Sequence, residues 1–247
     1  MNALVNGVRR KGKSTLAYAL ASERAKVIII WDPNDNYRAF PAFSDFDEFR
    51  RFFEQRSYST FDTESRKGEW TIRFVAGDEP SWEDFDDFVR IIRENCGGTY
   101  AIIVDEADML QTRANMSKGL AWLVRRAPTE QDAPETVHII QTTHSPKDIY
   151  TRSRNLITDF YIFHIKEPGD LDYLQQLTGD PDLAAQVQAL KGREVLHWYL
   201  DEVGEPKIIV EKDPTVWYVD IGSHRGRYEP TEAGDMKDGE TGTETGT

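Results

Sequence analysis

The sequence predicts an α/β domain, with a mostly parallel β-sheet that is covered by helices on both faces. Short apolar runs alternate along the chain with longer amphipathic segments, which is the order expected for such a sheet. Two of the runs, Lys26–Trp31 and Tyr100–Val104, are apolar almost throughout, as in strands that are buried on both faces. A chain of 247 residues can bury a core of this kind without disulfides or a structural metal.

The elements follow one another in a regular order. Ala3–Asn6 is expected as a first strand that ends in a glycine loop, and Ser14–Ser22, rich in Ala and Leu, as the helix after it. Residues 32–36 (Asp-Pro-Asn-Asp-Asn) then break the second strand, because these residue types favour turns. The remaining predicted elements are helices at Phe46–Phe53, Trp82–Asn95, Gly119–Arg126, Leu171–Leu177 and Leu183–Leu190, strands at Trp70–Val75, Val137–Gln141 and Phe160–Ile165, and a late β-hairpin formed by Val195–Leu200 and Lys207–Val210.

Composition divides the chain into one domain, residues 1–228, and an acidic tail, residues 229–247. The tail is rich in Gly, Thr and Glu and has nothing to bury, so we expect it to be disordered. Its six acids and one lysine supply −5 of the net charge of −13. This acidic balance weakens the case for a nucleic-acid partner without excluding one. A single cysteine excludes an intrachain disulfide, and neither a signal peptide nor a membrane-length apolar run is visible. We therefore expect a cytoplasmic protein with no membrane insertion.

The glycine loop carries the strongest functional signal. Gly7-Val8-Arg9-Arg10-Lys11-Gly12-Lys13-Ser14 matches the phosphate-loop pattern G-x-x-x-x-G-K-[ST] at every fixed position, between a strand and a helix as that pattern requires. Backbone N–H groups from Gly7 to Thr15 would cradle a triphosphate, Lys13 would bind its β- and γ-phosphates, and Ser14 would offer its hydroxyl to Mg²⁺. The sequence therefore predicts a P-loop NTPase of the RecA/ASCE-like type, with ATP as the nucleotide and GTP as the alternative.

Two further strands end in polar side chains at the edge of the sheet where ligands bind in α/β folds. Asp105 and Glu106 follow the strand Tyr100–Val104; Asp105 is predicted to hold Mg²⁺, and Glu106 to act as general base for the attacking water. Gln141, at the end of the next strand, is predicted to bond the attacking water or the γ-phosphate. His144 is interpreted as a structural or surface residue.

Four segments together resemble the HerA–FtsK superfamily of ring-forming, DNA-pumping ATPases, with viral genome-packaging ATPases and the Zot-like proteins of filamentous phages among its members. They are the near-terminal phosphate loop, the turn at residues 32–37, the acidic strand end at 103–107 and the glutamine strand with its Pro and Asp at 139–149. The resemblance covers about residues 3–180. It implies a homo-oligomeric ring in which an arginine finger, here Arg125 or Arg126, reaches a neighbour's nucleotide.

The same resemblance implies DNA as a partner, bound without sequence preference, and a viral capsid or membrane-vertex protein as a further one. Basic residues after the acidic strand and after the glutamine strand are candidates for contacts with DNA phosphates. The function indicated is that of an ATP-driven DNA translocase, in particular a genome-packaging motor. A Zot-like phage assembly ATPase, a nucleotide-dependent switch or adaptor and a small-molecule kinase are the alternatives.

Overall fold

The computed structural model describes residues 1–8, 11–55, 70–77, 79–127, 136–200 and 206–211. Within these ranges nine strands form one sheet, in the order β3-β4-β2-β5-β6-β1-β7-β8-β9. The strands are β1 (Asn2–Asn6), β2 (Val27–Trp31), β3 (Ala42–Phe43), β4 (Trp70–Phe74), β5 (Tyr100–Val104), β6 (Val137–Thr143), β7 (Asp159–Phe163), β8 (Val195–Leu200) and β9 (Pro206–Glu211). Neighbouring strands from β3 to β7 are parallel, whereas β7, β8 and β9 are antiparallel. The predicted mostly parallel sheet and its late hairpin are confirmed.

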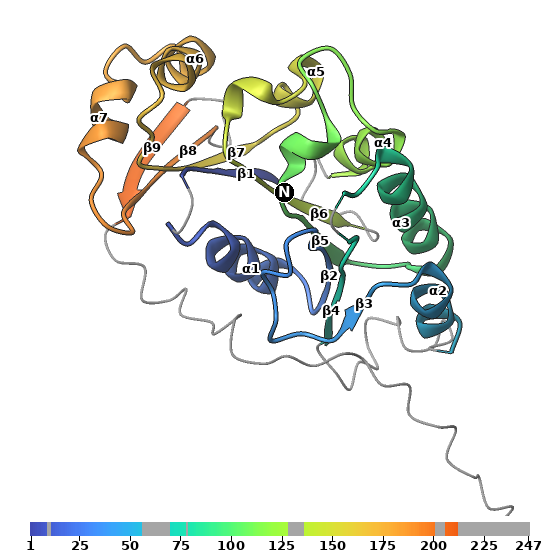
Figure 1. Cartoon of the computed structure of the whole chain (residues 1–247). Helices are drawn as coiled ribbons and strands as arrows, with labels where there is room; N and C mark the ends of the chain where they lie inside the picture. Colours follow the sequence, from blue (N-terminus) through green and yellow to red (C-terminus); the bar gives the residue numbers. More distant parts are fainter. Residues whose placement is uncertain (9–10, 56–69, 78, 128–135, 201–205, 212–247) are drawn as a thin grey trace, which may run out of the picture.

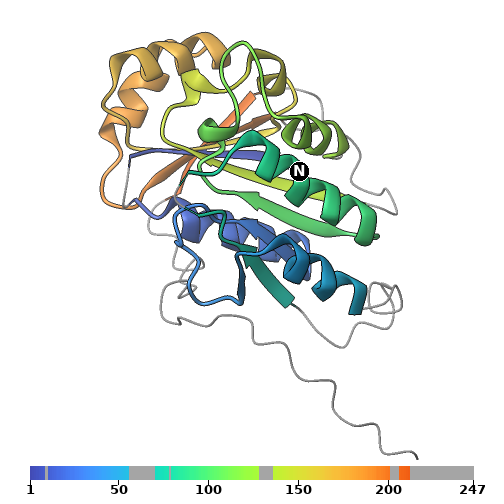
Figure 2. The same ribbon diagram turned by 45° about the vertical axis from the view of Figure 1, so that its right-hand side comes forward.

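Helices cover both faces of this sheet (Figure 1). They are α1 (Lys13–Arg24), α2 (Phe46–Gln55), α3 (Trp82–Asn95), α4 (Lys118–Arg126), α5 (Thr151–Arg154), α6 (Pro168–Thr178) and α7 (Leu183–Ala189), with short 3₁₀ helices η2 (Ala107–Leu110) and η3 (Pro146–Asp148). Helix α1 packs on one face, while α2, α3, α4, α6 and α7 pack on the other, and Figure 2 shows the sheet lying between these two layers.

Alternation of side chains along the strands decides which residues meet α1. On β2, Ile28 and Ile30 pack in the core cluster that contains α1, whereas Ile29 packs in the cluster that contains α2, α3 and α4. On β6, Ile140 belongs to the α1 cluster and Ile139 to the opposite one. Because successive side chains of a strand point to opposite faces, the even-numbered residues of β6 lie on the face that α1 covers.

The structure differs from the sequence prediction mainly in short elements and in the length of β6. This strand continues through Thr142 and Thr143, two residues beyond its predicted end at Gln141. The two-residue strand β3, the 3₁₀ helices and the single turn of α5 were not predicted, because elements this short show no hydrophobic periodicity. The tail at 229–247, and with it the predicted boundary at residue 228, lies outside the described residues.

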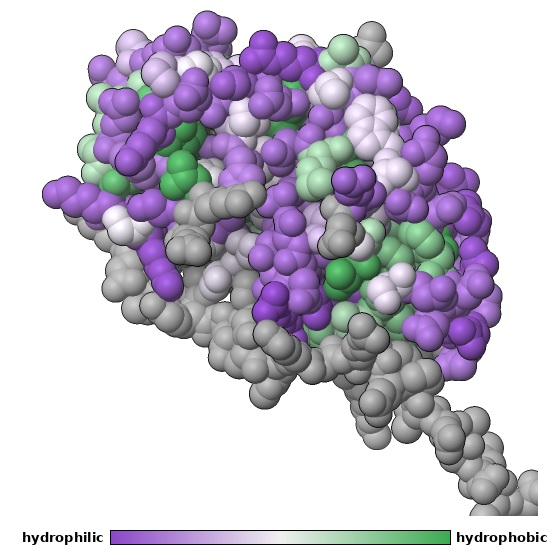
Figure 3. All heavy atoms as spheres, viewed as in Figure 1, coloured by the Kyte–Doolittle hydropathy of each residue, from purple (hydrophilic) through white to green (hydrophobic). Residues whose placement is uncertain are grey.

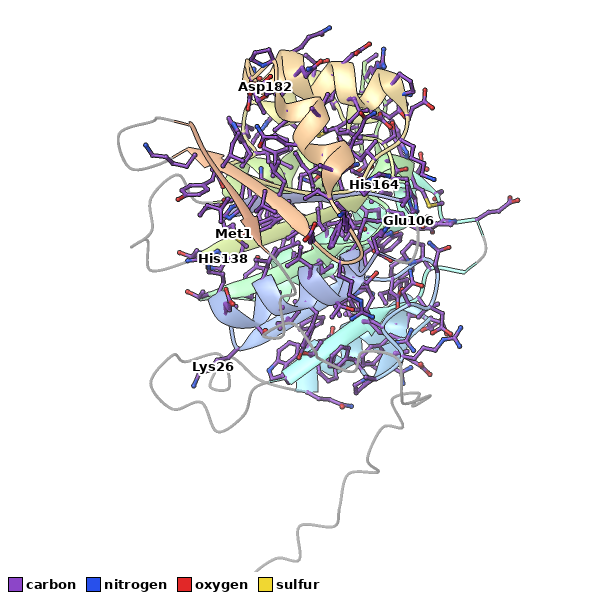
Figure 4. All side chains as sticks on the ribbon, turned by 90° about the vertical axis from the view of Figure 1, so that its left-hand side faces the viewer. Met1, Lys26, Glu106, His138, His164 and Asp182 are labelled. Carbon is purple, nitrogen blue, oxygen red and sulfur yellow. The ribbon has the colours of Figure 1, made fainter. Side chains whose placement is uncertain are left out.

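Parallel strands bring their carboxyl ends to one edge of the sheet. In Figure 4, Glu106, which follows β5, lies at one edge, while Met1, Lys26 and His138, which belong to the starts of β1, β2 and β6, lie at the other. We call the first of these the carboxyl edge and the second the amino edge. Ligands of open α/β sheets bind at the carboxyl edge, so the site is to be sought there.

One face of the molecule can be followed in a space-filling view. On the face shown in Figure 3, hydrophilic residues cover most of the coloured surface, and apolar residues form separate small groups. No helix in the described part of the chain is both long enough and apolar enough to cross a bilayer.

Candidate functional site: a phosphate-loop pocket at the carboxyl edge

A pocket of about 440 Å³ opens at the carboxyl edge of the sheet, a volume within the usual range for small-molecule sites. Four segments that are distant in sequence line it. They are Gly12–Thr15 at the start of α1, Asn34 and Asn36 in the turn after β2, Asp105 and Glu106 after β5, and Thr142 and His144 at the end of β6.

The glycine loop is shaped by its two glycines. Gly7 has φ 151°, and a Cβ there would lie 2.6 Å from the Cβ of Phe163 on β7, so a larger residue cannot occupy this position without a shift. Gly12 has φ 98° and precedes the first residue of α1, so the loop turns sharply into the helix N-terminus. This geometry directs backbone N–H groups and the positive end of the α1 dipole toward the pocket.

Lys13 lies folded against its own loop. Its Nζ donates to the carbonyl oxygens of Gly7, at 2.8 Å, and Val8, at 3.4 Å, and lies 3.1 Å from Nδ1 of His144. The side chain therefore rests on acceptors that a triphosphate would replace. Of the other predicted loop residues, Lys11 donates to the carbonyl oxygen of Gly192, and Arg9 and Arg10 lie outside the described residues.

Asp105 is held by hydrogen bonds from the end of β6 and from the turn after β2. Its Oδ1 accepts from Thr142 Oγ1 at 2.6 Å, and its Oδ2 accepts from Asn36 Nδ2 at 2.8 Å. The residue is 2% exposed, and burial raises the pKa of its carboxyl to about 6, although both hydrogen bonds act in the opposite direction. A buried carboxylate with this pKa is ionised at neutral pH. A cation in the same pocket would stabilise its negative charge.

Hydroxyl and carboxylate oxygens are the donors that Mg²⁺ prefers, and Ser14 and Asp105 both line the pocket. Among the residues that the structure describes, no group of three or more His, Cys, Asp or Glu could hold a metal by itself. The residues present therefore fit Mg²⁺ held jointly with nucleotide phosphates and water, as in other phosphate-loop sites.

The turn after β2 is rigidly anchored, and this fixes Asn36. Asp32 is fully buried; its carboxylate accepts from the backbone N–H groups of Asn36, at 2.7 Å, and Tyr37, at 2.9 Å. Arg73 of β4, 4% exposed, completes the arrangement with an ion pair to Asp32 at 2.9 Å. This buried network positions the amide that bonds Asp105.

Glu106 adopts the left-handed conformation, φ 52° and ψ 53°, which non-glycine residues rarely adopt. Its backbone N–H donates to Thr142 Oγ1 at 3.0 Å, and its Oε1 lies 3.2 Å from Nε2 of His144. A disfavoured backbone that the surroundings maintain is often part of a functional site. Here it turns the carboxylate into the pocket, 18% exposed.

Gln141 does not line the pocket. It is fully buried on the face away from α1, where its Nε2 donates to Asn2 Oδ1 at 3.2 Å and its Oε1 accepts from Gln111 Nε2 at 3.4 Å. Gln111 in turn accepts from the backbone N–H of Tyr150. Gln141 thus connects β1 to the segment after β5, and its bond to the attacking water or the γ-phosphate stays a prediction.

Thr142, His144 and Asn36 line the pocket and were not predicted as site residues. The first two differ from Gln141 in their place along β6, where Thr142 faces α1 and His144 follows the last residue of the strand. Side-chain alternation from Ile140 would have placed Thr142 correctly, had the strand been extended by two residues. Asn36 carried no such signal, because its contact with Asp105 joins two turns.

Arg125 and Arg126 lie away from their own pocket. Helix α4 starts where Ser117 bonds the carbonyl oxygen of Leu110 near the carboxyl edge, and both arginines belong to its last turn. The guanidinium of Arg126 lies 5.8 Å from the Trp122 ring centroid, as does that of Arg93 near the end of α3. Since α3 leads into the start of β5, Arg93 and Arg126 lie toward the amino edge. The finger role stays a prediction, and it requires a neighbouring subunit.

The fold and the loop define the class: the chain has the fold of P-loop NTPases. Comparison with solved structures gives the particular neighbours. The genome packaging NTPase B204 of Sulfolobus turreted icosahedral virus 2, in complex with ATP-gammaS, is 15% identical with a TM-score of 0.59, over 84% of this chain and 95% of that one. VirB4 of Thermoanaerobacter pseudethanolicus is 13% identical with a TM-score of 0.56, over 87% and 90%. No family model and no curated protein matches. The likeness confirms the fold expected from the resemblance.

Proposed function

We propose that this protein binds ATP with Mg²⁺, hydrolyses it, and uses the cycle to move DNA through a ring of identical subunits. The observation that supports hydrolysis most is the pocket itself. The turn into α1 and the ends of β5 and β6 bring a lysine, a serine, two acids and a histidine around one space of about 440 Å³. That set contains a phosphate clamp, ligands for a metal and a base for water.

Each group has a defined part in this proposal. Lys13 leaves the carbonyl oxygens of Gly7 and Val8 and donates to the β- and γ-phosphates. Ser14 and Asp105 would hold Mg²⁺, and the ion would supply positive charge to the phosphate oxygens. Glu106 accepts a proton from the attacking water. Thr142 stabilises both acids at once, since its Oγ1 donates to Asp105 and accepts from the backbone of Glu106.

Two substitutions test the hydrolytic part. Lys13→Ala should abolish or greatly weaken hydrolysis, since the charge on the β- and γ-phosphates loses its clamp, whereas Glu106→Gln should still bind an ATP analogue but turn over roughly 10²–10⁴-fold more slowly. Glu54→Gln on the exposed face of α2 is the matched control. Wild-type turnover by Glu106→Gln would refute its role as the base.

The ring is supported by the position of the arginines. An arginine supplied by a neighbour can raise phosphoryl-transfer rates by about 10³–10⁵-fold. Arg126 lies on an exposed turn beside Trp122 and Arg93, so this end of α3 and α4 presents positive charge, whereas the pocket contains the two acids that follow β5. Such charges are complementary across an interface between copies.

The ring is tested by mixing subunits. Arg126→Ala should lower hydrolysis without weakening ATP binding, and adding Glu106→Gln subunits should restore part of the activity, because some interfaces then regain both base and arginine. Arg90→Ala, on the exposed side of α3, is the control. Full activity of Arg126→Ala and Arg125→Ala, together with a strict monomer in sedimentation with ATP analogue and DNA, would refute the ring.

DNA movement is supported by the fold and by exposed cations. Lys118 at the start of α4 and Arg125 near its end are exposed and make no ion pair with other described residues. Other basic residues are neutralised in part, since Arg113 lies 3.9 Å from Asp148, and Lys147 lies 3.9 Å from both Glu167 and Asp170. Binding to DNA should fall steeply with salt and show little sequence preference, measured by fluorescence anisotropy with an ATP analogue present. No binding at low salt would refute this part alone.

A further inference from the structure

A chain of hydrogen bonds joins the lysine of the phosphate loop to the acid after β5. Lys13 Nζ lies 3.1 Å from His144 Nδ1, and His144 Nε2 lies 3.2 Å from Glu106 Oε1. One imidazole thus contacts, through its two nitrogens, the two side chains that the proposed reaction depends on most.

The hydrogen-bond partners of His144 decide its tautomer. An ammonium group is a donor only, so Nδ1 must accept from Lys13 and carries no proton. Nε2 then carries the proton of the neutral ring and donates a hydrogen bond to the Glu106 carboxylate, which is an acceptor. Asp108 is a third titratable group that interacts electrostatically with the ring, and it also interacts with Glu106.

The backbone on both sides of His144 is fixed, so the ring has little freedom to leave. Asn6 Nδ2 donates to the carbonyl oxygen of Thr143, and Thr143 Oγ1 and Ser145 exchange hydrogen bonds at 3.2 Å. Ser145 Oγ also donates to Asp170 of α6 at 2.9 Å. The side chain of His144 is 28% exposed, and it lines the pocket with both ring nitrogens in contact with other side chains.

We propose that His144 is a positioning residue: it orients the Glu106 carboxylate through Nε2 and registers, through Nδ1, whether Lys13 is engaged by phosphate. This inference deepens the proposed function and rests on it. When Lys13 turns to a γ-phosphate, Nδ1 loses its donor while Nε2 still holds Glu106, so the base is presented to water in one orientation. Lys13 and Glu106 are then coupled through a single ring.

Three substitutions separate the two contacts. In His144→Asn the amide can stand at the place of Nδ1 but is too short to reach Glu106, whereas in His144→Gln the amide nitrogen can stand at the place of Nε2 and donate to Glu106. His144→Ala removes both contacts. We expect kcat to fall roughly 10- to 100-fold in the Ala and Asn variants, which is part of the roughly 10²–10⁴-fold rate increase that a general base contributes. In the Gln variant kcat should lie within a few-fold of the wild-type value. KM for ATP should change little in all three.

His138→Gln is the matched control, because this histidine lies near the start of β6, at the amino edge, where its Nδ1 contacts the N-terminal amine (Figure 4). It should leave kcat unchanged. An unaltered kcat in His144→Ala would overturn the proposal, and so would an equal loss in all three His144 variants, since a structural role makes no distinction between Asn and Gln.

Imidazole ¹⁵N NMR tests the same inference without turnover. In the nucleotide-free protein the His144 ring should show an unprotonated Nδ1 and a protonated Nε2, and Glu106→Gln or Lys13→Ala should alter this pattern. A non-hydrolysable ATP analogue with Mg²⁺ should shift the Nδ1 resonance more than the Nε2 resonance. A reversed tautomer, or a ring that does not respond to the analogue, would overturn the inference. A protein that shows the expected tautomer but neither binds nor hydrolyses ATP would refute the proposed function instead.

Discussion

Replacing Asp105 by Asn should stabilise the metal-free protein, which is the reverse of what removing a well-bonded buried side chain usually does. Burial raises the pKa of this carboxyl from 3.8 to about 6. The folded state therefore holds the proton more tightly than the unfolded state, and keeping Asp105 ionised at pH 7.5 costs about 3 kcal/mol of folding free energy, from about 1.4 kcal/mol per pKa unit.

The pH window follows from the same two pKa values. Between about pH 4 and pH 6 the folded state binds more protons than the unfolded state, so the contribution of Asp105 to the free energy of unfolding falls as pH rises. Above about pH 7 the contribution of Asp105 no longer changes with pH. At pH 4.5 the unfolded chain is only partly protonated, and linkage leaves a cost of about 1 kcal/mol. The advantage of Asp105→Asn should thus shrink from about 3 to about 1 kcal/mol on acidification. Both values are upper limits, because an amide matches only one of the bonds from Thr142 and Asn36 without rearrangement.

Urea denaturation with EDTA at pH 7.5 and pH 4.5 measures this difference, with Asp172→Asn on the exposed side of α6 as the control. Comparing variants at each pH cancels the contributions of other acids. With Mg²⁺ and an ATP analogue the order should reverse, since only the wild type gains stability by binding the metal. A metal-free wild type that is the more stable protein at pH 7.5, or a difference that is the same at both pH values, would refute the reasoning.

Two further substitutions test how the pocket is built. Gly7→Ala should lower the free energy of unfolding by about 1–3 kcal/mol, because its Cβ would overlap Phe163, while Gly97→Ala, which meets nothing within 4 Å, should be nearly neutral in thermal denaturation. Arg73→Met should cost about 3–5 kcal/mol by leaving Asp32 buried without its ion pair, and adding Asp32→Asn should recover part of the loss in the same assay. A single Arg73→Met variant as stable as the double one would contradict this account of the turn.

Much of the fold was predictable because its signals are local. Strands buried on both faces need unbroken apolar runs, and β2 and β5 lie within a residue of their predicted bounds. The hairpin of β8 and β9 followed from two apolar runs around one glycine. The order of strands in the sheet was not predictable from such runs, since it depends on which faces the connecting helices cover.

The site was predictable only in part, and for a similar reason. Gly7, Gly12, Lys13 and Ser14 act as one contiguous turn, so their spacing alone predicted where they would lie. Gln141 shows the limit: it ends an apolar run as the prediction required, but β6 continues for two residues and the side chain points away from α1. A shift of one residue in a strand moves a side chain to the other face, so the end of a strand cannot be placed at the pocket without knowing its length.

By itself, the sequence determined that the chain has a phosphate loop, a sheet of buried parallel strands and an acidic pair after one of them. Tertiary structure decided which polar residues meet at the loop. It brought Asn36 from the turn after β2 to Asp105, placed Thr142 between the two acids, and set His144 between Lys13 and Glu106. The residues in these contacts are separated by between 36 and 131 positions in the sequence. Only the packing of β2, β5 and β6 around α1 makes them neighbours.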